Sequence, residues 1–240
     1  FAFSGNPFSR SELNIATVPT LPAASFRLHN VLGQGASGVI SRATWRQKQS
    51  EFPNEVAVKV FKGSVTSDGY PEDELQACLK TGEHKNIVSS LAQVNENGYL
   101  ALIMALIPEH FKNLGLPPTF DTCTRDTFPV GFSLSIEEIA KIVNQMADVF
   151  EHLHTNHVCH GDLYAHNTLF DTNANIIFGD FGAATMYHML NNTQQTLIKN
   201  IERRALHYFI QDLLSICQQQ DKQSEMFNTL EQQFKTNNLR

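Results

Sequence analysis

One stretch decides how this sequence is interpreted: His160-Gly161-Asp162-Leu163-Tyr164-Ala165-His166-Asn167. It places a carboxylate and an amide five positions apart on one predicted loop. Three other segments lie around it in a fixed order. They are the glycine-rich turn Leu32-Gly33-Gln34-Gly35-Ala36-Ser37-Gly38, the run Val56-Ala57-Val58-Lys59, and Asp180-Phe181-Gly182. Glycines let a backbone approach a ligand closely and offer it N–H groups, and Asp and Asn supply hard oxygen ligands. The order and spacing of the segments carry more weight than any one of them.

Bulk composition narrows the classes of protein. The chain has 240 residues, of which 42% are apolar and 18% charged, enough for one large domain or two lobes that share a cleft. A formal charge of −6 and the lack of any Lys/Arg run argue against a nucleic-acid partner. The apolar run from Leu100 to Ile107 is too short to cross a bilayer, so no membrane partner is expected.

The four cysteines and the start of the sequence bear on the cellular location of the protein. No signal peptide is visible, and no C-x-x-C pair occurs, which favours reduced thiols in a cytoplasmic protein over a disulfide or a zinc site. The cysteines are Cys78, Cys123, Cys159 and Cys217. Because the sequence begins at Phe1, we expect it to be a fragment of a longer protein.

The first part of the chain is expected to be rich in strands. Residues 1–25 contain much Ser, Pro and Ala without a clear period and are predicted to be an arm or linker. Residues 26–104 then form the first lobe, with a hinge at about 105–108. Its predicted elements are strands at 26–32, 39–45, 55–61, 87–94 and 99–107, and one helix at 72–81 that ends at Gly82.

The second lobe, residues 109–240, is predicted to be mainly helical. Residues 108–134 hold four prolines and form a long connection. Ser135-Ile136-Glu137-Glu138 is a capping box, and apolar residues then recur at helical spacing as far as Leu153. Short strands are expected at 168–170 and 176–178, and helix from Arg203 onward. The predicted class is α+β, with an antiparallel sheet and one helix in the first lobe and a shortened helical second lobe.

These motifs together resemble the protein kinases over roughly residues 26–217. More narrowly, the chain resembles bacterial protein kinases fused to leucine-rich repeats, although no repeat lies within it. The segments that prompt this are Pro71-Glu72-Asp73-Glu74, Asn113-Leu114-Gly115, Cys123-Thr124-Arg125-Asp126 and the Gly161–Asn167 loop. The resemblance implies a two-lobed kinase-like fold that transfers phosphoryl groups from Mg-ATP to a Ser or Thr hydroxyl of a protein, with autophosphorylation possible.

The resemblance also implies a nucleotide site. Gly33, Gly35 and Gly38 would cover the phosphates beside Leu32, and Met104 would limit access behind the adenine, with Ala105 and Leu106 offering backbone groups. The purine would lie between Ile40, Ala57 and Leu169. Glycine triplets also occur in dinucleotide-binding folds, but here a strand follows the turn rather than a helix. For the apolar residues, core packing is the competing explanation.

Four polar residues would carry the chemistry. Lys59 would contact the α- and β-phosphates and pair with a carboxylate of the 72–81 helix, with Glu74 the best candidate and Glu72 the alternative. Asp162 would act as the catalytic base toward the attacking hydroxyl. Asn167 and Asp180 would ligate magnesium. An Asp in a turn is often a simple turn former, so these assignments depend on the whole set.

Three departures from the kinase pattern complicate the functional prediction. Gly161 stands where an arginine usually precedes the catalytic Asp, so we expect activity without a phosphate on Thr185, Tyr187, Thr193 or Thr196. Tyr164 replaces a usual lysine. The A-P-E segment is absent; Ile201-Glu202-Arg203 is predicted in its place, with Asp212 anchoring the loop from the next helix, and little of a peptide-docking platform remains.

Two alternative functions therefore stay open. One is a small-molecule kinase of the aminoglycoside or choline kinase type, and the other is a nucleotide-binding pseudokinase that acts as a scaffold. The sequence identifies neither the substrate nor the oligomeric state.

Overall fold

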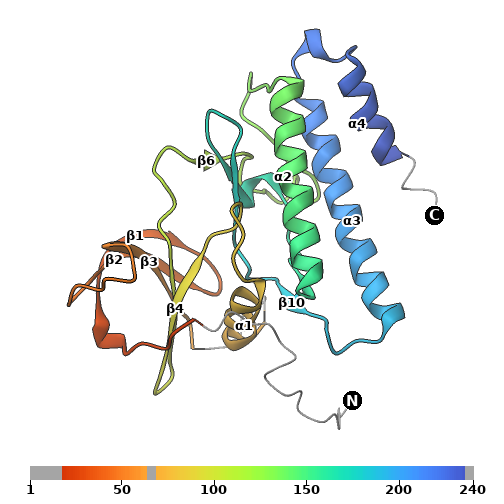
Figure 1. Ribbon diagram of the computed structural model, residues 1–240. Coiled ribbons are helices and arrows are strands. Elements are labelled where there is room, and N and C mark those ends of the chain that lie inside the picture. Colours follow the sequence, from red (N-terminus) through yellow and green to blue (C-terminus); the bar gives the residue numbers. More distant parts are fainter. Residues whose placement is uncertain (1–17, 64–68, 236–240) are drawn as a thin grey trace.

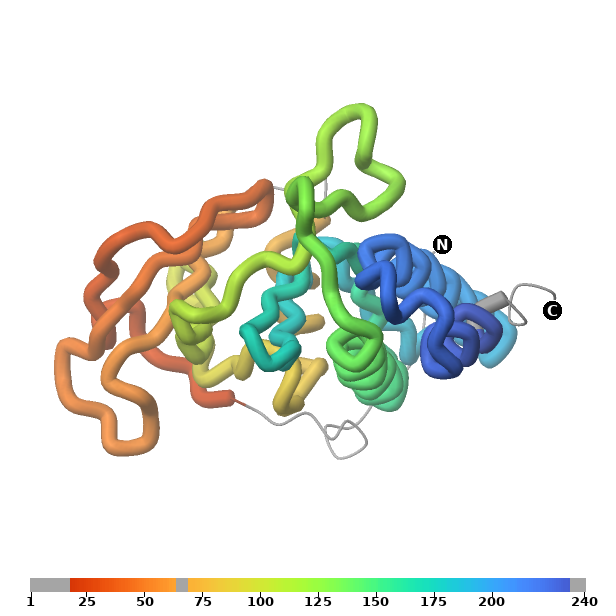
Figure 2. Tube along the Cα trace, turned by 90° about the horizontal axis from the view of Figure 1, so that it is seen from above, coloured from red at the N-terminus to blue at the C-terminus, as the bar shows by residue number. Residues whose placement is uncertain are grey.

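The computed structural model describes residues 18–63 and 69–235 and folds into two lobes. Figure 1 shows a strand-rich lobe beside a lobe dominated by the long helices α2 and α3. Figure 2, seen from above, shows the segment around β8 and β9 lying between the sheet of the first lobe and the helices of the second. The predicted α+β class with an antiparallel sheet and a helical second lobe is confirmed.

The first lobe is a five-stranded antiparallel sheet in the order β1-β2-β3-β5-β4. Its strands are β1 (Phe26–Gln34), β2 (Gly38–Trp45), β3 (Glu55–Phe61), β4 (Ser90–Glu96) and β5 (Tyr99–Met104). Alternation along β3 sets the two faces: Val56 and Val58 are fully buried in one apolar cluster, while Ala57 and Lys59 belong to the opposite face. The last two strands are shorter than predicted, since β4 begins at Ser90 and β5 ends at Met104.

Helix α1 (Pro71–Thr81) packs beside the sheet, and its ends are set by local chemistry. Pro71 occupies the first turn, where its missing N–H is not needed. Gly82 follows with φ of 69°, a left-handed conformation that glycine adopts at low cost, and stops the helix.

The predicted arm over residues 1–25 differs from the structure where it is described. Residues 1–17 lie outside the described residues. Leu21 N–H donates to Gln93 O at 2.8 Å and Gln93 N–H donates to Pro19 O at 3.0 Å, so this segment adds to the exposed edge of β4. A short 3-10 helix, η1 (Ala23–Ser25), leads into β1. Residues 18–25 are therefore part of the first lobe, because the free edge of β4 satisfies their backbone groups.

The second lobe is built on α2 (Ile136–Thr155), α3 (Asn192–Ser215) and α4 (Glu225–Lys235). Short elements surround them: β6 (Lys112–Asn113), β7 (Val158–Cys159), η2 (Ala165–Asn167), β8 (Thr168–Phe170), β9 (Ile176–Phe178), β10 (Thr185–Met186) and η3 (Gln219–Asp221). The predicted capping box is present, with Glu138 N–H donating to Ser135 Oγ and Ser135 N–H to Glu138 Oε2.

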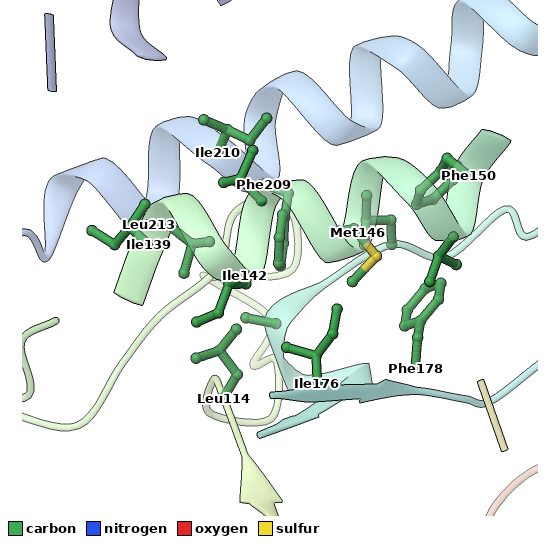
Figure 3. Close-up of a cluster of buried hydrophobic side chains, with 14 of the residues drawn as sticks. Leu114, Ile139, Ile142, Met146, Phe150, Ile176, Phe178, Phe209, Ile210 and Leu213 are labelled. Atoms are coloured by element: carbon green, nitrogen blue, oxygen red, sulfur yellow. The ribbon is translucent and has the colours of Figure 1, made fainter. Parts of the chain in front are cut away.

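The apolar stripe of α2 forms the core of this lobe. Figure 3 shows Ile139, Ile142 and Met146 of α2 meeting side chains of α3 and β9. The buried residues from those two elements include Phe209, Ile210, Leu213, Ile176 and Phe178. This packing fixes the floor on which the loop between β7 and β8 lies.

The start of α3 was predicted wrongly. The sequence pattern suggested helix from Arg203, but α3 begins at Asn192 with its own capping box between Asn191 and Gln194. The first turns of α3 carry few apolar residues, so their periodicity was hidden, and the cap was the available signal. Within the described residues, no helix has the combination of length and apolarity needed to cross a membrane.

Candidate active site

One face of the sheet collects the residues predicted to contact the nucleotide. The register pairs Ile40 with Lys59, Lys59 with Leu102, and Ala57 with Met104. Cross-strand partners share a face, so these side chains form one continuous surface. Lys59 is only 8% exposed, so its ammonium requires an anionic partner.

Glu74 of α1 supplies that partner. Lys59 Nζ donates to Glu74 Oε1, and the Glu74 carboxylate is itself buried, at 4% exposure. Glu72, the alternative considered from sequence, is exposed on the helix. The ion pair fixes the direction of the lysine, because each partner alone would be an uncompensated buried charge.

The three glycines of the turn have different physical roles. A Cβ built on Gly38 would lie 2.4 Å from Val60 O, so Gly38 is required by the close packing of β2 on β3. Gly33 and Gly35 have open space at that position. The turn itself is held by Gly35 N–H donating to Gly38 O at 3.0 Å and by Lys62 Nζ donating to Gly35 O at 2.9 Å.

Asp162 and Asn167 are brought together across η2. Asn167 Nδ2 donates to the Asp162 carbonyl at 3.0 Å and to Asp162 Oδ2 at 2.8 Å. Because the amide nitrogen is used in this way, Asn167 Oδ1 remains the atom that can coordinate a cation. The same contact fixes the Asp162 carboxylate.

His160 links this loop to the Asp180 segment. Asp162 N–H donates to His160 Nδ1 at 3.2 Å, so the ring proton is on Nε2, which donates to Gly179 O at 2.8 Å. The ring is fully buried and stacked on Phe178 with centroids 4.1 Å apart. Burial lowers the pKa of His160, so the neutral form holds both contacts.

Asp180 has an unusual backbone and an exposed carboxylate. Its φ is 53°, and Gly182 N–H donates to its Oδ1 at 3.3 Å. Its charge acts on His160 together with that of Asp162, and on Cys78 together with those of Lys59 and Glu74. Burial raises the pKa of the Cys78 thiol to about 12. The segment that carries Asp180 is joined to the loop of Asp162 through the hydrogen bond from His160 Nε2 to Gly179 O.

This donor set fits a magnesium ion. The Asp180 carboxylate and Asn167 Oδ1 are hard oxygen ligands of the kind Mg²⁺ prefers, and this ion keeps waters to complete its shell. Among the described residues no group of three or more His, Cys, Asp and Glu is arranged to hold a metal.

The backbone of Gly161 explains one departure from the kinase pattern. Its φ is 80°, and a Cβ at this position would lie 2.8 Å from Ala183 O. Gly161 N–H donates to Oε1 of Glu202, a residue of α3 that is 2% exposed. Burial raises the pKa of Glu202. The sequence singled out Glu202 only as part of a substitute for A-P-E; its contact with the loop was missed.

A second anchor reaches the loop through Asp126. Asp212 accepts hydrogen bonds from Arg125 Nε at 3.0 Å and from Asp126 N–H at 3.0 Å. Asp126 Oδ1 in turn accepts from Ala165 N–H at 2.8 Å. The predicted anchoring by Asp212 is thus indirect, and Asp126, which the sequence did not single out for this role, makes the contact.

The segment after Asp180 is short. Residues 183–191 connect Gly182 to α3, so Thr193 and Thr196 lie within the helix rather than in a loop. Thr196 Oγ1 donates to Asn192 O at 2.9 Å. Tyr187 is 1% exposed, and its hydroxyl contacts His154 Nδ1 at 3.1 Å. Of the four side chains considered as phosphate acceptors, Thr185 is the exposed one outside a helix.

The remaining predicted nucleotide contacts lie around the junction of the lobes. Met104 ends β5, and Ala105 N–H already donates to Ser89 O at 3.0 Å, which leaves its carbonyl for a ligand. Leu32 is 46% exposed on β1. Leu169 is on β8 in the second lobe, where it pairs with Asn113. Leu106 follows Ala105 in the connecting segment and is half-buried.

Comparison with known proteins gives distant relatives. The chain is 26% identical over 206 residues to fibroblast growth factor receptor 1 of Xenopus laevis, which covers 80% of this chain and 25% of the receptor. It is 27% identical over 209 residues to fibroblast growth factor receptor homolog 1 of Drosophila melanogaster, covering 80% and 28%. It is 27% identical over 165 residues to tyrosine-protein kinase receptor TYRO3 of Gallus gallus, covering 65% and 18%.

These relatives are animal receptors, and the chain spans between 18% and 28% of their length. They do not support the narrower resemblance to bacterial kinases fused to leucine-rich repeats. A family model described as protein tyrosine and serine/threonine kinase matches residues 26–222, which include every polar residue of the site described above. The chain therefore belongs to the protein tyrosine and serine/threonine kinase family.

Proposed function

We propose that this chain transfers the γ-phosphoryl group of ATP to a hydroxyl of a protein, with Asp162 as the catalytic base. The observation that carries the proposal is the pairing of Lys59 with Glu74 in the first lobe and of Asp162 with Asn167 in the second, with the Asp180 segment joined to the Asp162 loop through His160. These are the groups that phosphoryl transfer needs, since its catalysis depends mainly on positioning and on charge.

In this mechanism each residue has a limited task. Lys59, held by Glu74, binds phosphate oxygens, and the Gly33–Gly35 backbone covers them. Asn167 Oδ1 and the Asp180 carboxylate would hold the magnesium, which neutralises charge on the phosphates when bound. Asp162, fixed by Asn167, orients the acceptor hydroxyl and accepts its proton.

The acceptor class is the finer part of the proposal. The sequence resemblance favours a Ser or Thr hydroxyl, whereas one relative is named a tyrosine-protein kinase. We retain Ser/Thr as the proposed acceptor, and we keep the kinship to leucine-rich-repeat kinases and a cytoplasmic location as predictions. The four free cysteines are compatible with a reducing compartment.

Labelled ATP tests the proposal directly. The purified chain, with Mg²⁺ and a protein mixture, should give labelled protein, and Asp162→Ala should abolish the label. Phosphoamino-acid analysis of the product then separates Ser/Thr from Tyr. Equal labelling by the wild type and Asp162→Ala would contradict the proposed function.

A small-molecule kinase is the second candidate, favoured by the short 183–191 segment and by Tyr164 in place of a lysine. Incubation with a metabolite extract would reveal a phosphorylated small molecule in that case. Thermal stabilisation by Mg-ATP with no product in either assay would instead identify a nucleotide-binding scaffold.

A further inference from the structure

A groove of about 220 Å³ lies on the second lobe beside the loop of Asp162. Its walls come from three segments: residues 124–126, the loop residues Gly161, Leu163 and Tyr164, and the outer face of α3 between residues 201 and 212. Gly161 and Leu163 flank Asp162 in the chain, so the groove lies beside the backbone of the residue proposed as the catalytic base.

The volume of the groove limits the size of the group that it can bind. Pockets for complete small-molecule ligands usually measure about 300–1,000 Å³, so this one is too small for them. It is large enough for one side chain of an extended peptide. Residues 183–191 form only a short segment before α3, and the groove lies against this helix.

Three charged side chains line the groove: the carboxylates of Asp126 and Asp212 and the guanidinium group of Arg204. Asp212, whose side chain is 11% exposed, is neutralised by Arg125, and Asp126 is engaged by Ala165 N–H. Asp162 accepts from Asn167. The charge of Asp212 is therefore paired with a cation, whereas Asp126 and Asp162 accept hydrogen bonds from neutral donors.

Arg204 is different, because its positive charge has no acidic counterpart. Its Nη2 donates to the Tyr208 hydroxyl at 3.3 Å, and its guanidinium lies 5.6 Å from the centroid of the same ring. None of the ion pairs among the described residues involves it. The guanidinium group of Arg125 also lies over that ring, 5.1 Å from its centroid, so two guanidinium groups contact the Tyr208 ring.

We infer that this groove binds an acidic side chain of the protein substrate, close in sequence to the acceptor hydroxyl, and that Arg204 determines this specificity. The inference rests on the proposed function. Arg204 presents a planar set of N–H donors, which matches a carboxylate, and Ile201, 63% exposed on the same helix, offers apolar contact for the stem of a Glu side chain.

Three acceptor peptides test this inference. They have the same sequence except at the positions that flank the acceptor hydroxyl, which carry Glu, Gln or Lys. The full chain should show a kcat/KM for the Glu peptide about tenfold above that for the Lys peptide, since hydrogen bonds between charged groups are among the stronger ones. Arg204→Glu should reverse the order, and the milder Arg204→Gln should remove the preference. Arg203→Ala, at the adjacent exposed position of α3, is the matched control and should keep the wild-type order.

The outcomes separate the two claims. Transfer to all three peptides at equal kcat/KM, unchanged by Arg204→Glu, would overturn the inference and leave the proposed function standing. No transfer to any peptide, with the wild type equal to Asp162→Ala, would overturn the proposed function and the inference with it. A preference that Arg203→Ala abolishes as fully as Arg204→Gln would show a general charge effect and would overturn the role of Arg204.

Discussion

Gly161 N–H donates a hydrogen bond to Oε1 of Glu202 at 3.0 Å, so α3 holds the backbone immediately before Asp162. Glu202 is buried at 2% exposure, and its contact with the loop crosses from one element of the second lobe to another. The position of the proposed catalytic base is therefore held in part by α3, which begins at Asn192 after the short segment 183–191.

Removing this acceptor should weaken both folding and catalysis. Glu202→Ala leaves the Gly161 N–H without its partner and should lower the free energy of unfolding by about 1–3 kcal/mol, with a lower kcat. Glu202→Gln keeps a carbonyl acceptor and should lose less of both. The exposed Glu151→Ala on α2 is the control, and equal effects of Glu202→Ala and Glu151→Ala would contradict the role of the contact.

Substitutions in the buried ion pair of Lys59 and Glu74 should affect stability and activity differently. Lys59→Met leaves Glu74 buried and unpaired, which should lower the free energy of unfolding by about 3 kcal/mol. The double variant Lys59→Met/Glu74→Leu should recover most of that loss. Phosphoryl transfer should remain about 10²–10³-fold slower in both variants, because the phosphate contact is missing. Denaturant unfolding and kcat measured in parallel check this, and recovery of activity in the double variant would refute the catalytic role of Lys59.

Gly161 and Gly131 form a matched pair for testing the loop geometry. Both have left-handed φ values, 80° and 79°, but only Gly161 has a backbone oxygen, Ala183 O, within 2.8 Å of a built Cβ. Each alanine variant should lose about 1 kcal/mol from the backbone conformation alone. Gly161→Ala should lose more and should lower kcat as well. Equal unfolding free energies for the two variants would show that the contact with Ala183 is easily relieved.

Alanine substitutions at two glycines of the turn, Gly38 and Gly35, should also have different effects. Gly38→Ala should unfold the first lobe, because its Cβ would meet Val60 O at 2.4 Å, whereas Gly35→Ala has open space and should fold. We expect Gly35→Ala to keep its thermal midpoint and to weaken the stabilisation given by Mg-ATP. Thermal unfolding with and without nucleotide measures both effects. A normally stable Gly38→Ala would contradict the packing argument.

Asp126 should make stability depend on pH. Burial raises the pKa of its carboxyl to about 6 from its usual 3.8, so the folded state binds this proton more tightly than the unfolded state does. Between about pH 4 and 6 the free energy of unfolding should therefore fall as pH rises, by at most about 3 kcal/mol from this group. Above about pH 6 the contribution of Asp126 to the free energy of unfolding no longer changes with pH.

Asp126→Asn keeps an acceptor for Ala165 N–H and cannot titrate, so its stability should fall less steeply over that range. Asp121→Asn, an exposed change in the same connection, serves as the control. Urea unfolding at several pH values gives the slopes. Parallel curves for the wild type and Asp126→Asn would show that Asp126 does not cause the dependence.

Most of the strands and helices, and the identity of the polar site residues, follow from local sequence. Period-two alternation marks β3, a capping box marks the start of α2, and Gly82 marks the end of α1, because each depends on neighbours a few residues away. Asp162, Asn167 and Asp180 are recognisable for the same reason, since their spacing within two short motifs is a local property.

Tertiary structure alone decided which groups meet. The choice of Glu74 over Glu72 depends on how α1 is rotated against the sheet, and the contact between Glu202 and Gly161 depends on where α3 begins. The chain from Asp212 through Asp126 to Ala165 joins residues far apart in sequence. Such contacts come from packing of whole elements, which no short segment specifies.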